Sequence, residues 1–447
     1  MRGLRSTIAL LVVLIGLSVY IYYFSWRQTG TDTGPKQEKV FAGLQTDTID
    51  EITITAESGE KTTIKKTKDA WQIVSPVSDD VDAAEVSGIT SNLGTLEVAR
   101  VIDEHPSDLK EYGLASPRIE VQFKAGGKGS LKLLVGEKSP TGGQLFVKKN
   151  DEPRVFLIPA FHETTFNRST FDLRDKRLLK FERDKVDAVD VTAGGKTLAL
   201  KKDGSDWKLV TPTAAKADYG TVEGLIGRVQ SAHIKSIVTA EAPPADLKKY
   251  GLDKPATTVN VVSGSARATL LVGNKTDENA FYARDSSRPM VFVIDGALAQ
   301  ELGKGPDEYR RKDVFEMRAF NVNRVELTRG GQTSIFEMTK GAGDSAPVKW
   351  RRVSPNAADV DREKVEEFLT KLSNLRATAF VESTTNTGVD KPVLAVRATF
   401  DEKKEDRVNF GQTGNDVFAA HSGEPGVAKV DTTDFTDALK ALDEVSK

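Results

Sequence analysis

The side chains that most often carry out chemistry are few and scattered in this sequence. The four histidines are His105, His162, His233 and His421, and no two of them stand at the His-x-His or His-x-x-x-His spacing of a metal site. There is no cysteine, which excludes thiolate catalysis, disulfides and cysteine-ligated metals. A serine nucleophile would need a Gly-x-Ser-x-Gly turn, whereas residues 263–265 read as a loop between strands. We therefore predict no catalytic residue, no cofactor and no metal.

One glycine-rich stretch looks like part of a phosphate-binding loop. Residues Ala193–Thr197 match the end of the Gly-x-x-x-x-Gly-Lys-Thr pattern, but Asp190 stands where its first glycine is required. When the sequence is aligned on its internal repeats, Gly195 falls in register with Gly59 and Gly331. We predict that all three glycines form hairpin turns, in which glycine adopts a positive φ.

Acidic residues cluster before one predicted helix. Asp79, Asp80 and Asp82 could bind calcium, but the Asp-x-Asp-x-Asp-Gly spacing of a calcium loop is absent. Asp82 suits the N-cap of the helix, while Asp79, Asp80 and Glu104 have no role that the sequence identifies. Asn167 begins an Asn-x-Ser glycosylation pattern, which we interpret as a chance match.

Three tryptophans occupy equivalent positions and admit two interpretations. Trp71, Trp207 and Trp350 could form sugar-stacking platforms or pack in a core. An apolar residue follows two positions later in the first two cases, at Ile73 and Leu209, and would share the tryptophan's face of a strand. The pattern favours core packing.

Two charged tracts, Leu173–Arg177 and Tyr309–Asp313, could be basic patches that bind a partner. Exposed runs of charge are common on protein surfaces, so solvated linker surface is the favoured interpretation. Both tracts close a repeated unit, which places them between domains.

Internal repeats organise the chain. The element Trp-x-x-Val-[Ser/Thr]-Pro occurs three times, with spacings of 136 and 143 residues between its tryptophans. Asp82, Asp218 and Asp361 stand at the same spacings, and each precedes apolar residues with helical periodicity. The predicted apolar faces are Val86, Ile89, Leu93 and Leu96, then Val222, Leu225, Ile226 and Val229, then Val365, Phe368, Leu369, Leu372 and Leu375. Glu85 is predicted to complete a capping box with Asp82.

Two further elements recur after each predicted helix. The turn element Tyr-Gly-Leu-x-x-Pro begins at Tyr112 and Tyr250, and a degenerate form begins at Thr387. A strand ending in Leu-Val-Gly or Asn-Phe-Gly follows, with its glycine at Gly136, Gly273 and Gly411. Each unit is predicted as a hairpin, a strand ending in Trp, a capped helix, this turn and three or four more strands.

These elements predict an α+β chain with an N-terminal transmembrane helix and three tandem, mostly antiparallel modules, each with one capped helix on its sheet. The predicted segments are the following: 1–29, cytoplasmic stub and transmembrane helix; 30–45, linker; 46–182, 183–318 and 319–447, the three modules, the last degenerate in its turn element and ending in a short helix, Asp434–Val445.

The N-terminus is predicted to anchor the chain in a membrane. Thr7–Phe24 is an uncharged run of 18 residues, long enough to span about 30 Å of hydrocarbon as a helix. Arg2 and Arg5 precede it, which predicts a cytoplasmic N-terminus and an extracytoplasmic body at the inner membrane. A cleaved signal peptide is the alternative, but the aromatic exit lacks a small-x-small cleavage site. The net charge of −2 argues against nucleic acid as a partner.

The three repeated elements together resemble an uncharacterised family of bacterial envelope proteins, catalogued only as a domain of unknown function. The resemblance covers nearly everything after Lys39. It implies an N-terminal anchor, association with gliding-motility-type and related ABC export systems, and protein partners in an envelope transport complex. The function expected is a non-enzymatic scaffold or accessory protein of such a system. An envelope hydrolase, or a protein that binds a ligand between modules, is the alternative.

Overall fold

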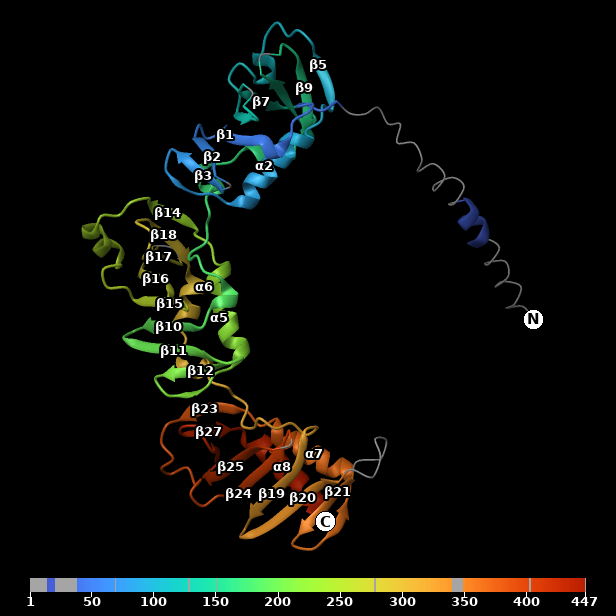
Figure 1. Cartoon of the computed structure of the whole chain (residues 1–447), viewed down its shortest axis with the longest axis vertical. Coiled ribbons are helices and arrows are strands. Elements are labelled where there is room, and N and C mark those ends of the chain that lie inside the picture. The colour runs from blue at the N-terminus through green and yellow to red at the C-terminus, as the bar shows by residue number, and fades with distance from the viewer. Residues whose placement is uncertain are drawn as a thin grey trace. The chain divides into compact units, whose positions relative to one another are not determined.

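The computed structural model in Figure 1 describes residues 14–20, 38–68, 70–127, 129–150, 152–276, 279–339, 349–401 and 403–446. The chain divides into two compact units, Met1–Lys176 and Arg177–Lys447. The first unit holds one module and the second unit holds two.

Three modules repeat one order of elements. The first contains β1 Ile49–Thr55, β2 Lys61–Thr67, β3 Ala70–Ser75, β4 Asp79–Asp80, α2 Ala83–Thr95, β5 Arg100–Asp103, β6 Ile119–Ala125, β7 Leu131–Lys138, β8 Gln144–Lys149, β9 Val155–Pro159, α3 His162–Phe166 and α4 Thr170–Leu173. The second contains β10 Ala188–Ala193, β11 Lys196–Asp203, β12 Asp206–Thr211, β13 Ala215–Lys216, α5 Tyr219–Ser231, β14 Ser236–Thr239, β15 Thr257–Ser263, β16 Ala266–Lys275, β17 Ala280–Asp285, β18 Val291–Asp295 and α6 Gly296–Leu302. The third contains β19 Val322–Arg329, β20 Gln332–Thr339, β21 Lys349–Ser354, β22 Ala358–Val360, α7 Arg362–Ser373, β23 Ala377–Val381, β24 Leu394–Phe400, β25 Lys404–Thr413, β26 Asp416–His421, β27 Val427–Val430 and α8 Thr432–Ser446.

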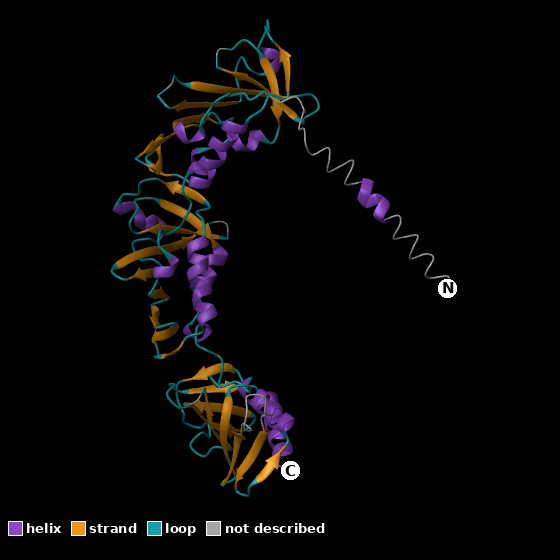
Figure 2. Ribbon diagram, turned by 45° about the vertical axis from the view of Figure 1, so that its right-hand side comes forward, coloured by secondary structure: helices purple, strands orange, loops and turns teal. Residues whose placement is uncertain are grey.

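Each module is built on one nine-stranded antiparallel sheet. The strand order in the first is β4-β3-β2-β1-β6-β7-β8-β9-β5, and the other two sheets repeat it position by position. The long helix packs against one face of its sheet (Figure 2), and its predicted apolar side chains are buried in all three modules. The prediction of tandem antiparallel modules is therefore confirmed, and the third module has the full strand order despite its degenerate turn element.

The helix content differs from the prediction of one helix per module. A second helical segment follows the last hairpin in each module: α3 and α4, then α6, then α8. Only α8 was predicted, because its counterparts are four to seven residues long and carry no periodic signal over so few residues.

The N-cap aspartates are confirmed. Asp82, Asp218 and Asp361 each accept a backbone N–H from the first turn of their helix, at 2.9, 2.8 and 2.8 Å. The predicted capping box at Glu85 is wrong, because the Glu85 carboxylate pairs with Arg168 at 2.8 Å instead. A salt bridge to a neighbouring segment thus takes the place of the local contact.

The turn glycines also take the predicted conformation. Gly59, Gly195 and Gly331 have φ of 84°, 76° and 81° in the turn of each first hairpin. Gly194 and Gly195 form the two-residue connection between β10 and β11, so the apparent phosphate loop is a hairpin. In the Tyr-Gly-Leu turns, Gly113 and Gly251 have φ of 66° and 69°.

The tryptophans begin their strands and do not end them, which corrects the prediction. Trp71, Trp207 and Trp350 each stand at the second position of β3, β12 and β21, and the Ser-Pro or Thr-Pro bond at the end of each of these strands is cis. Trp207 and Trp350 are 1% and 2% exposed. Trp71 is partly buried against the core of its module, so the core assignment holds fully for two copies and in part for the first.

The predicted membrane-spanning segment Thr7–Phe24 lies outside the described residues except for a helical stretch at 14–20. Within the described part of the chain, no helix combines the length and apolar character needed to cross a membrane.

A candidate site where the second module joins the third

The charged tract after each of the first two modules completes the edge of that module's sheet. In the first unit, the Asp82 N–H donates to the Leu173 carbonyl at 2.9 Å, and the Asp175 N–H donates to the Asp80 carbonyl at 3.0 Å. Between these bonds, Val81 and Arg174 form an antiparallel bridge. The tract therefore adds a short strand beside β4, and its interpretation as solvated linker surface is wrong.

The second unit repeats this pairing beside β13. The Asp218 N–H donates to the Tyr309 carbonyl at 2.8 Å, and the Arg311 N–H donates to the Lys216 carbonyl at 2.9 Å. Ala217 and Arg310 form the antiparallel bridge. The same two hydrogen bonds thus position both tracts, although their side chains differ.

The bridging arginines are buried. Arg174 is 7% exposed and its guanidinium lies 3.1 Å from the Asp79 carboxylate, which gives that unexplained acid a role as a counter-ion. Arg310 is also 7% exposed, but its guanidinium lies 3.9 Å from the centre of the Phe380 ring and donates to the Pro425 carbonyl at 3.2 Å. Burial lowers the pKa of Arg310 from its ordinary value. A buried cation held by an aromatic face and a carbonyl ties the second module to the third.

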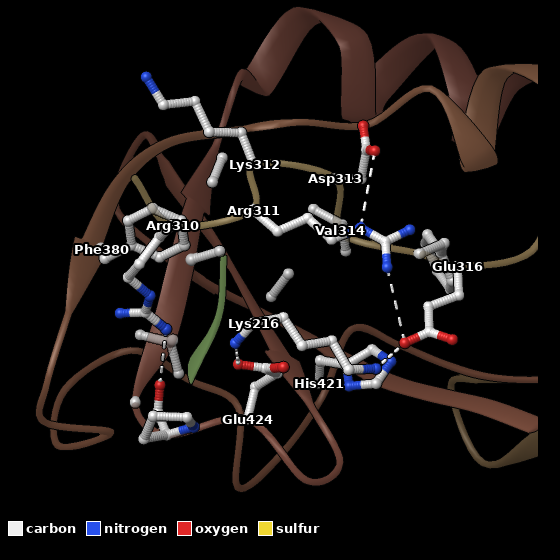
Figure 3. Close-up of a pocket in the computed structure, with 17 residues that line it drawn as sticks. Lys216, Arg310, Arg311, Lys312, Asp313, Val314, Glu316, Phe380, His421 and Glu424 are labelled. Atoms are coloured by element: carbon white, nitrogen blue, oxygen red, sulfur yellow. Dashed lines mark hydrogen bonds and ion pairs between the residues drawn. The ribbon is translucent and has the colours of Figure 1, made fainter. Parts of the chain in front are cut away.

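An ion-pair network surrounds this joint (Figure 3). Lys216, at the end of β13, pairs through its ammonium with Glu316, which also lies 3.7 Å from Arg311. Asp313 pairs with Arg318 at 3.0 Å and Arg376 at 3.7 Å. These contacts link the tract to both neighbouring modules.

A buried carboxylate anchors the first residues of the third module. Asp406 is 1% exposed and accepts the backbone N–H groups of Glu316 and Met317 at 2.8 and 2.7 Å. It also lies 3.0 Å from Nε2 of His421. Nδ1 of His421 is buried and has no hydrogen-bond partner among the described residues. An imidazole held by a carboxylate is the geometry of an oriented general base.

The space beside His421 limits what that pair can do. The pocket it lines, together with Lys216, Arg310, Glu316 and Glu424, has a free volume of about 50 Å³, which is room for one or two water molecules. Such a volume is far below the several hundred Å³ of ordinary small-molecule sites. The arrangement is suited to holding a water and two chain segments together.

The remaining sequence candidates are not among the residues that line this pocket. His105 and Glu104 are exposed in the first unit, and His233 is an exposed residue whose backbone pairs with Arg177 in the second. Asn167 accepts the Glu57 N–H at 3.0 Å, so it fixes a loop of the first module. Across the residues that the structure places, no group of three or more potential ligands could hold a metal ion.

His162 gives the first unit a predictable pH response. The side chain is largely buried between Phe161 and Phe166, and burial lowers its pKa below 6.5. The unfolded chain therefore binds a proton more readily, so stability is full above pH 6.5 and falls as the pH drops through the lowered pKa. We expect urea unfolding to show this loss between pH 7.5 and 5, and His162→Leu to remove its share. Equal pH dependence in both proteins would contradict the assignment, and exposed His105→Leu is the matched control.

The alternation of buried and exposed residues along β25 is the sequence pattern that could have identified Asp406 as a buried carboxylate. In that strand, Asp406, Val408 and Phe410 alternate with exposed residues and are all buried. A carboxylate on the apolar face of a strand must find several donors there, because a buried charge is otherwise strongly destabilising. His421 could not be linked to it from sequence, since the strand register is a long-range property.

Comparison with known proteins gives one family and no function. The family described as "Domain of unknown function (DUF4340)" matches residues 71–208, 207–392 and 350–447. No protein of curated function matches the chain. Among solved structures, the DNA polymerase sliding clamp from Pseudomonas aeruginosa is 11% identical, with 88% of this chain and 93% of the clamp covered and a TM-score of 0.17. A putative DNA polymerase III beta subunit from Eubacterium rectale is 7% identical, with 88% and 92% covered and the same TM-score of 0.17. A score of this size supports no argument about fold or function.

Proposed function

This chain belongs to the family of the domain of unknown function DUF4340, and from that premise we propose that it is a non-enzymatic, membrane-anchored scaffold outside the cytoplasm. The observation that carries the proposal is the role of the residues that recur in all three modules. The turn glycines, the N-cap aspartates and the strand tryptophans each serve turns, helix ends or packing. The residues that recur at equivalent positions in the three modules therefore maintain the fold of the module.

The joint between the second and third modules supports the same proposal. Its charged groups are used in ion pairs and backbone contacts that link two modules, as for Lys216 with Glu316 and Arg310 with Pro425. A chain of linked modules can hold several weak contacts at once and gain affinity through effective concentration. The small free volume beside His421 gives little support to a ligand bound in that pocket.

The anchor and the partner are the finer parts of the proposal. The uncharged run Thr7–Phe24 after Arg2 and Arg5 supports attachment to the inner membrane with the modules outside the cytoplasm. The resemblance described above supports an accessory role in an ABC-type envelope transport system. In this role the protein binds other proteins of the complex and does not bind nucleic acid.

The topology predicts the behaviour of a reporter. Alkaline phosphatase fused after Lys447 should be active in intact cells, because this enzyme matures only outside the cytoplasm. The fusion should stay with membranes in high salt, since hydrophobic insertion is not screened by ions. A fluorescent reporter that matures in the cytoplasm is the reciprocal control, and bright fluorescence with an inactive phosphatase would contradict the topology.

In-cell crosslinking followed by mass spectrometry tests the scaffold itself. The full chain should capture the same few envelope proteins in repeated experiments. The matched control is residues 1–45 joined to an unrelated folded domain, which keeps the predicted anchor and linker and removes the modules. If the control captures the same proteins at the same yield, the modules do not bind them and the proposal fails.

A further inference from the structure

The outer edge of each sheet ends in a short strand that can bond to one more segment. In the first module this strand is β4, and in the second it is β13. The charged tract pairs with the strand through two backbone hydrogen bonds and so covers its open edge. One bond uses the N–H of the N-cap aspartate, Asp82 or Asp218, and the other uses the carbonyl two residues earlier. The same pairing at two independent edges shows that the edge is built to receive an added strand.

The equivalent edge in the third module is β22, followed by the N-cap residue Asp361. Its bonding groups are the Asp361 N–H and the Asp359 carbonyl, and no hydrogen bond from another described residue reaches either group across that edge. Ala358 and Val360 at this edge are half-buried, whereas the equivalent Ala215 and Ala217 of the second module are buried. Among the described residues, no added strand covers this edge, in contrast to the other two modules.

Open strand edges bind extended peptides by adding a strand, with the backbone supplying affinity and the side chains specificity. We propose that the β22 edge binds an extended segment of a partner protein, with a bulky apolar residue and a basic residue two positions later, as an added antiparallel strand. The covered edge of the second module gives the pattern of this segment, because Tyr309 stands opposite Asp218 and Arg311 stands opposite Lys216, whose counterparts in the third module are Asp361 and Asp359.

Charge supports this choice of partner. The β22 edge carries the carboxylates of Asp359 and Asp361, and no ion pair engages either of them within the described chain. A basic residue at the position of Arg311 would stand opposite Asp359 on the same face of the sheet, and charge complementarity favours its encounter. A second copy of this chain fits less well, because its tracts already fill the edges at Val81 and Ala217.

The inference rests on the proposed scaffold function and names one of its surfaces. A fluorescent peptide with the sequence of residues 306–312 is the probe, and its binding to the full chain in detergent is measured by anisotropy. We expect one peptide per chain. N-methylation of the residue that corresponds to Arg311 removes the donor to the edge carbonyl, so it should weaken binding at least fivefold. N-methylation at Lys312, the next residue, is the matched control and should leave binding within twofold.

The binding site is located by a second measurement. A photoreactive residue in place of the peptide's tyrosine should crosslink to residues 358–362. Asp359→Lys should weaken binding of the peptide. Asp390→Lys reverses the charge of another exposed aspartate in the third module and should leave binding unchanged. Equal binding of the two N-methylated peptides, or crosslinks at residues 79–82 or 215–218, would overturn the proposal. If the peptide fails to bind while in-cell capture of partners still requires the modules, the edge assignment is wrong and the scaffold function stands.

Discussion

Replacing Trp207 with alanine should lower the free energy of unfolding of the second unit by about 3–5 kcal/mol. The indole is 1% exposed, so its removal leaves a cavity that a close-packed core cannot fully close. Its Nε1–H also donates to the Glu223 carboxylate at 3.0 Å, and that hydrogen bond is lost with the ring. Urea unfolding followed by circular dichroism measures the change.

The matched substitutions separate packing from general damage. Trp71→Ala should cost less, because Trp71 is only partly buried in its own module. Val210→Ala, at a position 50% exposed in the same strand as Trp207, should change stability little. If Trp207→Ala unfolds at the same urea concentration as the original protein, Trp207 is not a core residue and a surface role such as sugar stacking returns.

Gly273→Ala should destabilise the second module by about 1–3 kcal/mol or more, as overpacking does in other cores. A Cβ at position 273 would lie 2.1 Å from the Tyr250 carbonyl oxygen and 3.1 Å from the Gly251 carbonyl carbon. These are backbone atoms, so the turn itself must move to relieve the contact. The same close approach occurs at Gly136 and Gly411, which explains why the Tyr-Gly-Leu turn element and the strand element that ends in glycine recur together.

Gly224→Ala is the control for this substitution. Gly224 lies in α5, and nothing would contact a Cβ there within 4 Å. Alanine favours a helix over glycine by up to about 1 kcal/mol, so Gly224→Ala should stabilise the module. Thermal unfolding of the two variants in parallel should therefore move in opposite directions. If Gly273→Ala does not lower the unfolding temperature, the strand at Gly273 does not approach the turn so closely.

Local features of the fold were predictable because each is decided within a few residues. The N-cap of Asp218 and the positive φ of Gly195 depend on the adjoining turn, and the buried face of α5 depends on a period of 3.6. The repeats strengthened each of these predictions, since three independent sequences had to agree on one structure.

The unpredicted features depend on contacts between distant residues. The short edge strands β4 and β13 have two residues each, too few to show an alternating pattern. Their existence is defined by a partner far along the chain, as when Lys216 bonds Arg311. The sequence predicts solvated linker surface for the charged tracts for the same reason, because their partners lie far along the chain. The contact between Asp406 and His421 likewise depends on the register of β25 and β26, which the sequence does not show.

The pairing of the first two edges with the tracts that follow their modules sets an order for biosynthesis. A chain emerging from a ribosome, or threading through a translocation pore, presents β13 long before Tyr309–Arg311 arrives to cover it. The second sheet therefore keeps an unsatisfied edge through most of its synthesis, which is the period when chaperones are most needed to prevent intermolecular strand pairing. Arrival of the tract closes that edge and delivers the first residues of the next module in one step, so maturation proceeds vectorially from the first module to the last.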